Sequence, residues 1–224
     1  MGLNDRVITG IEGFDKLVEG GFPKNSVVIV AGGPGAGKTI FSAQYIHHGA
    51  LNGEKGVYVS FGETAEIFKE YMRRFGLDFQ KLEKDGKAVI LDLTVPKLGL
   101  ETNLDLIEQE VRELDAKRLV IDSFSAIALA LGEKVDVRTT LHMLTKIFRE
   151  INCTTIMVVD ISIGSKTIGT GLEEFLADGI VILDTSLANG QLQRNLLIRK
   201  MRGTNHSIKT CPYLITEQGI VIVE

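Results

Sequence analysis

The chain has 224 residues, of which 44% are hydrophobic and 24% are charged, and its formal net charge is −4. This composition is ordinary for a globular protein and supplies enough apolar residues for a sizeable core. The small negative charge excludes a long-range field that would gather nucleic acid.

Short runs rich in Val and Ile alternate along the chain with segments of helical periodicity. In chain order the predicted elements are a strand at 26–31, a helix at 38–52, a strand at 56–61, a helix at 64–76, a strand at 88–93, a helix at 102–116, a strand at 118–122, a helix at 135–151, and strands at 154–159 and 179–184. Most of the strands lack an alternating polar face, which is typical of strands covered on both sides. The pattern predicts an α/β fold with a mainly parallel sheet and helices on both faces.

The last quarter of the chain has a different pattern. Asn189 and Gly190 stand between two strand-like runs, which is the strongest short signal for a β-hairpin. Two further strand-like segments, PYLIT and GIVIVE, follow near the end. We therefore expect an antiparallel extension of the sheet, and a single domain over residues 1–224.

Signals for export or membrane attachment are missing from the sequence. The first ten residues lack the apolar core of a signal peptide, and Arg6 stands where N-myristoylation needs Ser or Thr. No apolar run approaches the roughly 18 residues that span a bilayer. Cys153 and Cys211 form no metal pattern and are predicted to be reduced thiols. We expect a cytoplasmic protein with no membrane partner.

A glycine-rich segment, AGGPGAGKTIF, joins the first predicted strand to the first predicted helix. It matches the phosphate-loop pattern G-x-x-x-x-G-K-[ST] from Gly32 to Thr39. Its inner glycines allow backbone angles that turn successive N–H groups toward an anion, and the helix adds its positive end. Lys38 is expected to reach the β and γ phosphates, and Thr39 to ligate Mg²⁺. The predicted nucleotide-contacting residues are Gly33, Pro34, Gly35, Ala36, Gly37, Lys38, Thr39 and Ile40.

Two carboxylates follow predicted strands at the edge where ligands bind in open α/β sheets. Asp122 ends the strand at 118–122 and is expected to hold the hydration shell of Mg²⁺. Glu63 follows the strand at 56–61 and is a candidate for activating the attacking water. The alternative for Glu63 is a place in the first helical turn, where a negative charge is favourable by electrostatics alone.

A basic segment, RKMRGTNH, lies near the end of the chain. If residues 196–202 form a strand, then Ile198, Lys200 and Arg202 share one face, and the two cations are about 7 Å apart. Such a pair suits the γ-phosphate end of a nucleotide, in its own site or in a neighbour's. The alternative is a solvated basic edge strand that discourages aggregation.

The opening segment from Thr9 to Thr39, TGIEGFDKLVEGGFPKNSVVIVAGGPGAGKT, resembles the start of single-domain KaiC-like ATPases, archaeal paralogues of RadA in the RecA superfamily. The end of the chain is similar to the close of a KaiC domain, above all in KMRGTNH. The resemblance implies a RecA-type core and a homo-oligomeric ring, expected to be a hexamer, with ATP or ADP between subunits. It also implies that Lys200 and Arg202 reach the phosphates of the adjacent subunit, with His206 nearby.

One position departs from that family pattern, and Asp160 differs from many RecA relatives while it is closer to the acidic residue of KaiC itself. The family usually has a Glu-Glu pair after the second strand, whereas this chain has Gly62 and Glu63. The first carboxylate, usually taken as the one that activates water, is therefore missing, and we expect slow turnover unless Glu63 substitutes. Asp160 stands near the point where many relatives carry a sensing glutamine.

Four functions remain open from the sequence. The first is an oligomeric Mg-dependent ATPase, and the second is a hydrolysis-deficient module in which ATP holds an interface together. The third is an autokinase, and the fourth is a DNA recombination accessory with cationic pore loops. The candidate phosphate acceptors are Ser123, Ser125, Thr139 and Thr140, and the candidate DNA contacts are Lys134 and Lys166.

Overall fold

The computed structural model describes residues 5–93, 100–131, 146–162, 167–168, 177–188 and 190–223. A short β1 (Arg6–Val7) pairs with β2 (Phe22–Pro23) beside the main sheet. The strands of the main sheet are β3 (Val27–Gly32), β4 (Gly56–Ser60), β5 (Ala88–Asp92), β6 (Arg118–Asp122), β7 (Thr154–Asp160), β8 (Gly179–Ala188), β9 (Gln191–Met201), β10 (Cys211–Thr216) and β11 (Gly219–Ile222).

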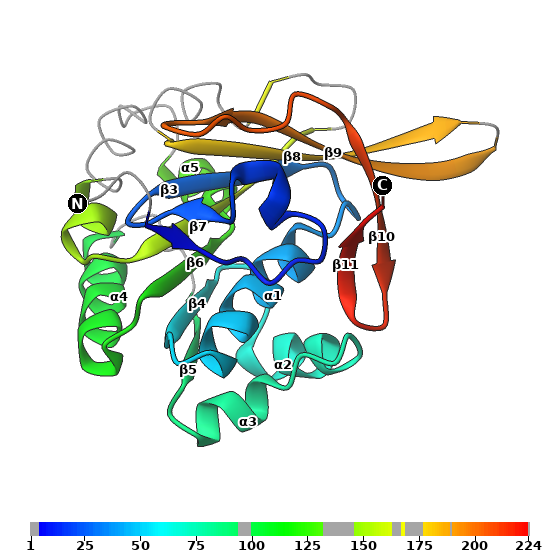
Figure 1. Ribbon diagram of the computed structural model, residues 1–224. Coiled ribbons are helices and arrows are strands. Elements are labelled where there is room, and N and C mark those ends of the chain that lie inside the picture. The colour runs from blue at the N-terminus through cyan, green and yellow to red at the C-terminus, as the bar shows by residue number, and fades with distance from the viewer. Residues whose placement is uncertain are drawn as a thin grey trace.

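Within these residues the main sheet runs in the order β11-β10-β9-β8-β3-β7-β6-β4-β5 (Figure 1). Neighbouring strands are parallel from β8 to β5, whereas β9, β10 and β11 are each antiparallel to their neighbours. The predicted α/β fold, with a mainly parallel sheet and an antiparallel C-terminal extension, is confirmed. β3 is paired with β7 and β8 along its two edges and is covered by a core on each of its two faces, which accounts for its unbroken apolar sequence.

The sheet has an apolar core on each face. Side chains alternate along β3, so that Val28 and Val30 pack in the cluster formed by α1, α2, α3 and the N-terminal segment, while Ile29 and Ala31 pack in the cluster of α4 and α5 (Figure 1). The helices are η1 (Asp15–Val18, a 3-10 helix), α1 (Lys38–Leu51), α2 (Ala65–Arg73), α3 (Phe79–Lys84), α4 (Leu100–Leu114) and α5 (Phe124–Leu131). In the part of the chain that the structure describes, no helix is long and apolar enough to cross a bilayer.

Some elements differ from their predicted bounds. The helices α3 and α5 were not predicted, because α3 is only six residues long and α5 is short and almost entirely apolar, with no helical periodicity of polar residues. The predicted helix at 135–151 is helical at 146–150, and residues 135–145 lie outside the description. The predicted cap of α2 is confirmed, since the Thr64 side chain accepts a hydrogen bond from the Ile67 backbone N–H.

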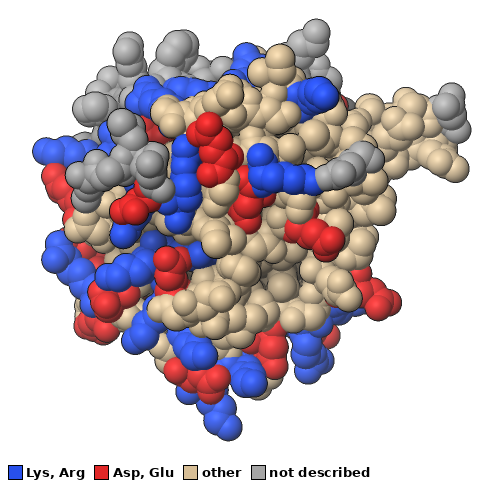
Figure 2. All heavy atoms as spheres, in the orientation of Figure 1, with Lys and Arg blue, Asp and Glu red and all other residues tan. Residues whose placement is uncertain are grey.

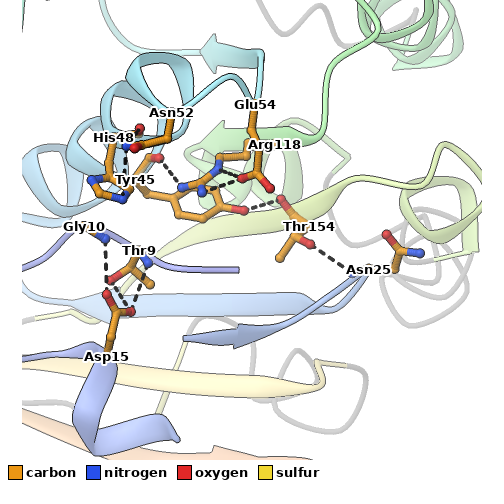
Figure 3. A network of polar contacts seen from close by, with 10 residues as sticks. All are labelled: Thr9, Gly10, Asp15, Asn25, Tyr45, His48, Asn52, Glu54, Arg118 and Thr154. Carbon is orange, nitrogen blue, oxygen red and sulfur yellow. Dashed lines mark hydrogen bonds and ion pairs between the residues drawn. The ribbon is translucent and has the colours of Figure 1, made fainter. Parts of the chain in front are cut away.

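The buried Arg118 and its half-buried partner Glu54 belong to a network that ties α1 to the amino ends of β6 and β7 (Figure 3). Arg118, which is 2% exposed, donates to the Glu54 carboxylate (2.8 Å from Nε) and to the Tyr45 carbonyl (2.7 Å). Its guanidinium also lies 4.6 Å from the centroid of the Tyr45 ring. The Tyr45 hydroxyl in turn donates to the Thr154 carbonyl at 2.9 Å, and burial raises the pKa of Tyr45 far above its ordinary value. Gly49 is required here, because a Cβ would lie 2.2 Å from Arg118 Nε.

Candidate functional site

The glycine-rich loop runs from the carboxyl end of β3 to the first turn of α1. Gly35 and Gly37 have φ angles of 73° and 89°, in the left-handed region that favours glycine. Gly33 is not in that region, and an added Cβ would have no atom nearer than 3.9 Å. The expectation that the inner glycines supply special backbone angles therefore holds for two of the three, and Gly33 is not required by its backbone conformation.

Lys38, the first residue of α1, is held beside this loop. Its Nζ donates to the carbonyls of Gly32 (2.9 Å) and Gly33 (3.0 Å), and lies 3.0 Å from Asp160 Oδ1. Asp160 ends β7 and is the register partner of Gly32, so the two meet at the carboxyl edge of the sheet. The Lys38 side chain is only 11% exposed, which strengthens its interactions with any anion at this edge.

Thr39 and Asp122 are brought together, as the sequence predicted for a metal site. The Thr39 hydroxyl donates to Asp122 Oδ2 at 2.8 Å, and the Tyr58 hydroxyl donates to the same oxygen at 2.6 Å. Burial raises the pKa of Asp122, while the hydrogen bonds from Tyr58 and Thr39 act in the opposite direction. Hydroxyl and carboxylate oxygens form a hard donor set that suits Mg²⁺.

Tyr58 was missed by sequence reasoning, because the local sequence shows its unusual residue type but not its partner. It is the only aromatic residue in β4, a strand otherwise made of small and aliphatic residues. Burial and the neighbouring Asp122 carboxylate raise its pKa well above the ordinary value, so it remains a hydrogen-bond donor. Tyr58 therefore fixes the orientation of the Asp122 carboxylate.

Glu63 lies between β4 and α2 and outside the first turn of that helix. Its backbone is fixed by Ser60, whose hydroxyl donates to the Glu63 carbonyl (2.8 Å) and accepts from the Glu63 N–H (3.1 Å). Thr64 is the N-cap, so α2 begins only at Ala65. The alternative reading of Glu63 as a first-turn residue is thus wrong. Glu63 is exposed and lines the same cavity as Thr39.

This cavity has a volume of about 1000 Å³ and opens beside the start of α1. Its walls come from α1, α2 and the turn between β10 and β11. The lining residues are Thr39, Ile40, Glu63, Tyr71, Met72, Arg74, Phe75, Ile215, Thr216 and Glu217. Aromatic and aliphatic side chains beside a phosphate-type loop provide an apolar surface on which a planar ring can lie.

The C-terminal hairpin of β10 and β11 supports the loop from one side. The hydroxyl of Tyr213, which is 2% exposed, donates to the Ala36 carbonyl at 2.6 Å. A Cβ on Gly37 would lie 3.0 Å from Ile215, which shows how closely the hairpin approaches the loop. The Gln44 side chain of α1 accepts from the Ile220 N–H at 2.6 Å. Sequence reasoning missed these contacts because they join residues about 180 positions apart.

Lys200 and Arg202 lie at the opposite edge of the sheet. The backbone N–H of Arg202 donates to the Asp178 carbonyl, and the N–H of Asp178 donates to the carbonyl of Val27, the first residue of β3. Gly32 is five residues further along β3, about 17 Å away. The Lys200 Nζ donates to the Ala177 carbonyl at 2.7 Å, and Arg202 Nη1 lies 3.3 Å from Asp178 Oδ1. The two cations therefore cannot contact the loop of their own chain.

The other candidate residues fall into two groups. His206 follows in the connection after Arg202, and its Nδ1 lies 3.0 Å from the Ser207 carbonyl. Ser123 and Ser125 both contact Asp160 with their side chains. The Ser123 hydroxyl donates to the Asp160 carboxylate, and the Ser125 hydroxyl accepts from the Asp160 backbone N–H. Four of the candidates lie outside the described residues, namely Lys134, Thr139, Thr140 and Lys166.

Comparison with known proteins gives a consistent result over almost the whole chain. The model of the family described as "ATPase: KaiC" matches residues 7–224. The crystal structure of the KaiC-like protein PH0186 from Pyrococcus horikoshii is similar with a TM-score of 0.90 and 44% sequence identity. That match covers 98% of this chain and 99% of the solved one.

Curated relatives agree with this assignment. A UPF0273 protein of Thermotoga maritima is 37% identical over 232 residues, covering 97% of this chain and 95% of the relative. The UPF0273 protein PF1931 of Pyrococcus furiosus is 34% identical over 232 residues, and the match covers 97% of this chain and 93% of the relative. The circadian clock protein KaiC3 of Synechocystis is 36% identical over 231 residues, but the match covers only 46% of that protein.

Proposed function

The chain belongs to the KaiC family of ATPases, with a RecA-type fold, and from this premise we propose that it is a Mg-dependent ATPase whose site is completed by a second copy of itself. One observation carries the proposal: Lys38, Thr39 and Asp122 meet at the carboxyl edge of the sheet, with Thr39 and Asp122 2.8 Å apart. That is the edge at which open α/β sheets bind ligands.

The phosphates of the nucleotide occupy the glycine-rich loop. Backbone N–H groups of the loop and of the first turn of α1 donate to the phosphate oxygens. Lys38 exchanges its contact with Asp160 for the β and γ phosphates. Thr39 and Asp122 hold Mg²⁺, which when bound neutralises charge that develops on the phosphates.

The adenine ring occupies the cavity beside α1. Its support is the position of the cavity, which begins at Thr39 and Ile40 and therefore continues directly from the loop. Tyr71, Phe75 and Ile215 supply apolar and aromatic surface for the ring. The rim residues Arg74 and Glu217 provide polar groups for the ribose and the ring edge.

Lys200 and Arg202 of another copy complete the binding site of the γ-phosphate. These residues lie about 17 Å from the loop of their own chain, measured along β3. A head-to-tail arrangement brings the amino edge of one copy to the carboxyl edge of the next, and such contacts close into rings. Each site then contains two parts. The first is the glycine-rich loop of one chain with Lys38, Thr39 and Asp122, called the cradle below, and the second is the cation pair of its neighbour.

A second candidate, a hydrolysis-deficient assembly module, is favoured by Gly62. Without the first carboxylate of the family pair, ATP is bound and holds the interface without rapid cleavage. Single-turnover measurement separates the two candidates. Cleavage of bound ATP within minutes supports the enzyme, and ATP that stays intact while the assembly persists supports the module.

The proposed function is tested with purified protein, Mg-ATP and two measurements on the same sample. Phosphate release is expected to be slow and to require Mg²⁺, and light scattering after size exclusion is expected to show nucleotide-dependent assembly. The Lys38→Ala variant, which lacks the cation of the cradle, should show neither. Wild-type protein that binds no Mg-ATP would overturn the proposal.

The support of the loop by Tyr213 gives a specific prediction. Tyr213→Phe leaves the buried Ala36 carbonyl without its donor, which costs about 1–3 kcal/mol. Because that carbonyl belongs to the cradle, the Kd for Mg-ATP should rise about 5- to 150-fold, as measured by isothermal titration calorimetry.

The matched control is Tyr45→Phe. It removes a similar buried hydroxyl, which donates to the Thr154 carbonyl at 2.9 Å, far from the cradle. This control should lower the melting temperature while leaving the Kd for Mg-ATP unchanged. Equal Kd values for all three proteins would show that Tyr213 has no part in positioning the loop.

A further inference from the structure

β8 and β9 continue beyond the carboxyl edge of the parallel sheet as a two-stranded arm. The arm is defined here as residues 185–188 and 190–194. Leu183 is the register partner of Gly32, the last residue of β3. From Thr185 and Arg194 to Ala188 and Gln191, the two strands pair only with each other among the described residues. Five residues beyond Leu183 correspond to about 17 Å. Figure 1 shows this hairpin extending away from the body of the molecule.

The arm carries no charge along most of its length. Residues 185–193 read TSLANGQLQ, and Figure 2 shows the projection as an uncharged surface next to a body dotted with charges. Leu187 and Leu192 are 79% and 53% exposed and lie directly opposite each other in the register. Opposed residues of an antiparallel pair point to the same face, so they form one apolar patch. An isolated two-stranded hairpin is only marginally stable in water.

The direction of the arm identifies what covers it. It leaves the sheet at the carboxyl edge, where Lys38 and Asp122 lie, whereas Lys200 and Arg202 lie at the amino edge. Suppose that the cations of one copy approach the cradle of a second copy. The arm of the second copy then extends into the space that the first copy occupies. We propose that the Leu187–Leu192 patch docks on a second copy of this chain, a step that rests on the proposed function.

The receiving surface lies beside Arg202. Ile208, in the connection after β9, is 85% exposed, and Ile8, after β1, is 53% exposed. The two segments are neighbours, because Arg6 Nη1 donates to the Thr204 hydroxyl at 2.7 Å. Arg6 also donates to the Gly203 carbonyl, next to Arg202, so the segment of Ile8 lies near the cation pair. Ile208 lies in the connection that leads from Arg202 to Cys211, and the carboxyl edge carries the apolar arm. The contact is heterologous, with different surfaces on the two copies.

The test replaces both leucines of the arm, in Leu187→Thr with Leu192→Thr. Threonine retains β-propensity, so the hairpin can still form. We expect the dissociation constant of the assembly, from sedimentation across a dilution series in Mg-ATP, to rise roughly 10²- to 10⁴-fold, because each buried leucine contributes about 10- to 100-fold. The control, Ser186→Thr with Gln193→Thr, changes an opposed and exposed pair on the other face of the arm and should assemble as wild type does.

Mixing variants tests the second surface. Ile208→Asp should also prevent assembly, and an equimolar mixture with the leucine variant should form dimers, because one intact arm then meets one intact receiving surface. A mixture that remains monomeric, or a leucine variant that assembles like wild type, overturns the inference.

The outcome is distinguishable from failure of the proposed function. The cradle lies within one chain, so the leucine variant should still bind Mg-ATP, as measured by equilibrium dialysis. Wild-type protein that binds Mg-ATP and stays monomeric at every concentration would overturn the second copy as the occupant of the arm. Wild-type protein that binds no Mg-ATP would instead remove the proposed function itself.

Discussion

Replacing Lys200 and Arg202 together with alanine is expected to lower ATP turnover by roughly 10³- to 10⁵-fold, the range for cations that act on the γ-phosphate from a neighbouring protein. Because these residues lie at the edge opposite the loop, nucleotide binding to a single chain should remain. Phosphate release and the Kd for Mg-ATP, measured on the same preparation, separate the two effects. Arg199→Ala is the matched control, since it removes an exposed cation of the same strand that is not one of the proposed pair.

The fold should tolerate the double substitution. The ion pair between Arg202 and Asp178 joins side chains that are 54% and 16% exposed, and such surface pairs contribute about 0–1 kcal/mol. Asp178 retains its contact with Arg149 at 2.8 Å and with the Val27 N–H at 3.0 Å. A melting temperature close to that of wild type would confirm that the loss of turnover is not a loss of folded protein.

Mixing experiments test whether the two cations act between chains. Asp122→Asn removes the charge that holds Mg²⁺ but preserves an oxygen that can accept from Thr39 and Tyr58. This variant and the variant with both Lys200→Ala and Arg202→Ala are each expected to be inactive alone. In an equimolar mixture, about one interface in four joins an intact cradle to an intact cation pair, so part of the activity should return. No recovery in a mixture that assembles would show that the cations do not act across an interface.

The fold was largely predictable from the sequence because its signals are local. The apolar strands, the amphipathic α2 and α4, the phosphate loop and the Asn189-Gly190 hairpin each depend on residues within one short segment. Asp122 and Thr39 were also predictable, since parallel strands and the helix after β3 deliver their functional residues to one edge. These predictions needed no knowledge of how distant segments pack.

The remaining features depend on contacts between distant segments. The Tyr213 hydroxyl reaches Ala36, and Tyr58 reaches Asp122, but neither tyrosine carries a local sign of its partner. The cavity is formed by α1, α2 and the β10–β11 turn, which only the folded chain brings together. The separation of Lys200 and Arg202 from their own cradle follows from the antiparallel pairing of β8 with β9. Periodicity alone predicted the strand but not which edge its end would reach. The prediction that Ile198 and Lys200 share a face was wrong, because the register shifts between them and Met201 packs in the same core as Ile198.

Restoring the missing carboxylate, in Gly62→Glu, is expected to raise the single-turnover rate of ATP cleavage by roughly 10²- to 10⁴-fold, the usual contribution of a general base. The position accepts a side chain, because a Cβ on Gly62 would have no atom within 4 Å and its φ angle is not in the left-handed region. Gly62 precedes Glu63, which lines the cavity with Thr39, so a glutamate there lies close to the proposed γ-phosphate position.

The controls for this variant separate charge from geometry. Gly62→Gln adds a side chain of the same size without a base and should leave the rate near that of wild type. Glu63→Gln in the wild-type background reports whether Glu63 already serves as the base. If Glu63→Gln lowers the rate as strongly as Gly62→Glu was expected to raise it, then Glu63 has replaced the missing carboxylate. In that case the gain from Gly62→Glu should be small, because a second base adds little once water is already activated. If neither change alters the rate, the slow step lies outside proton transfer, and the absence of the first carboxylate does not explain slow turnover.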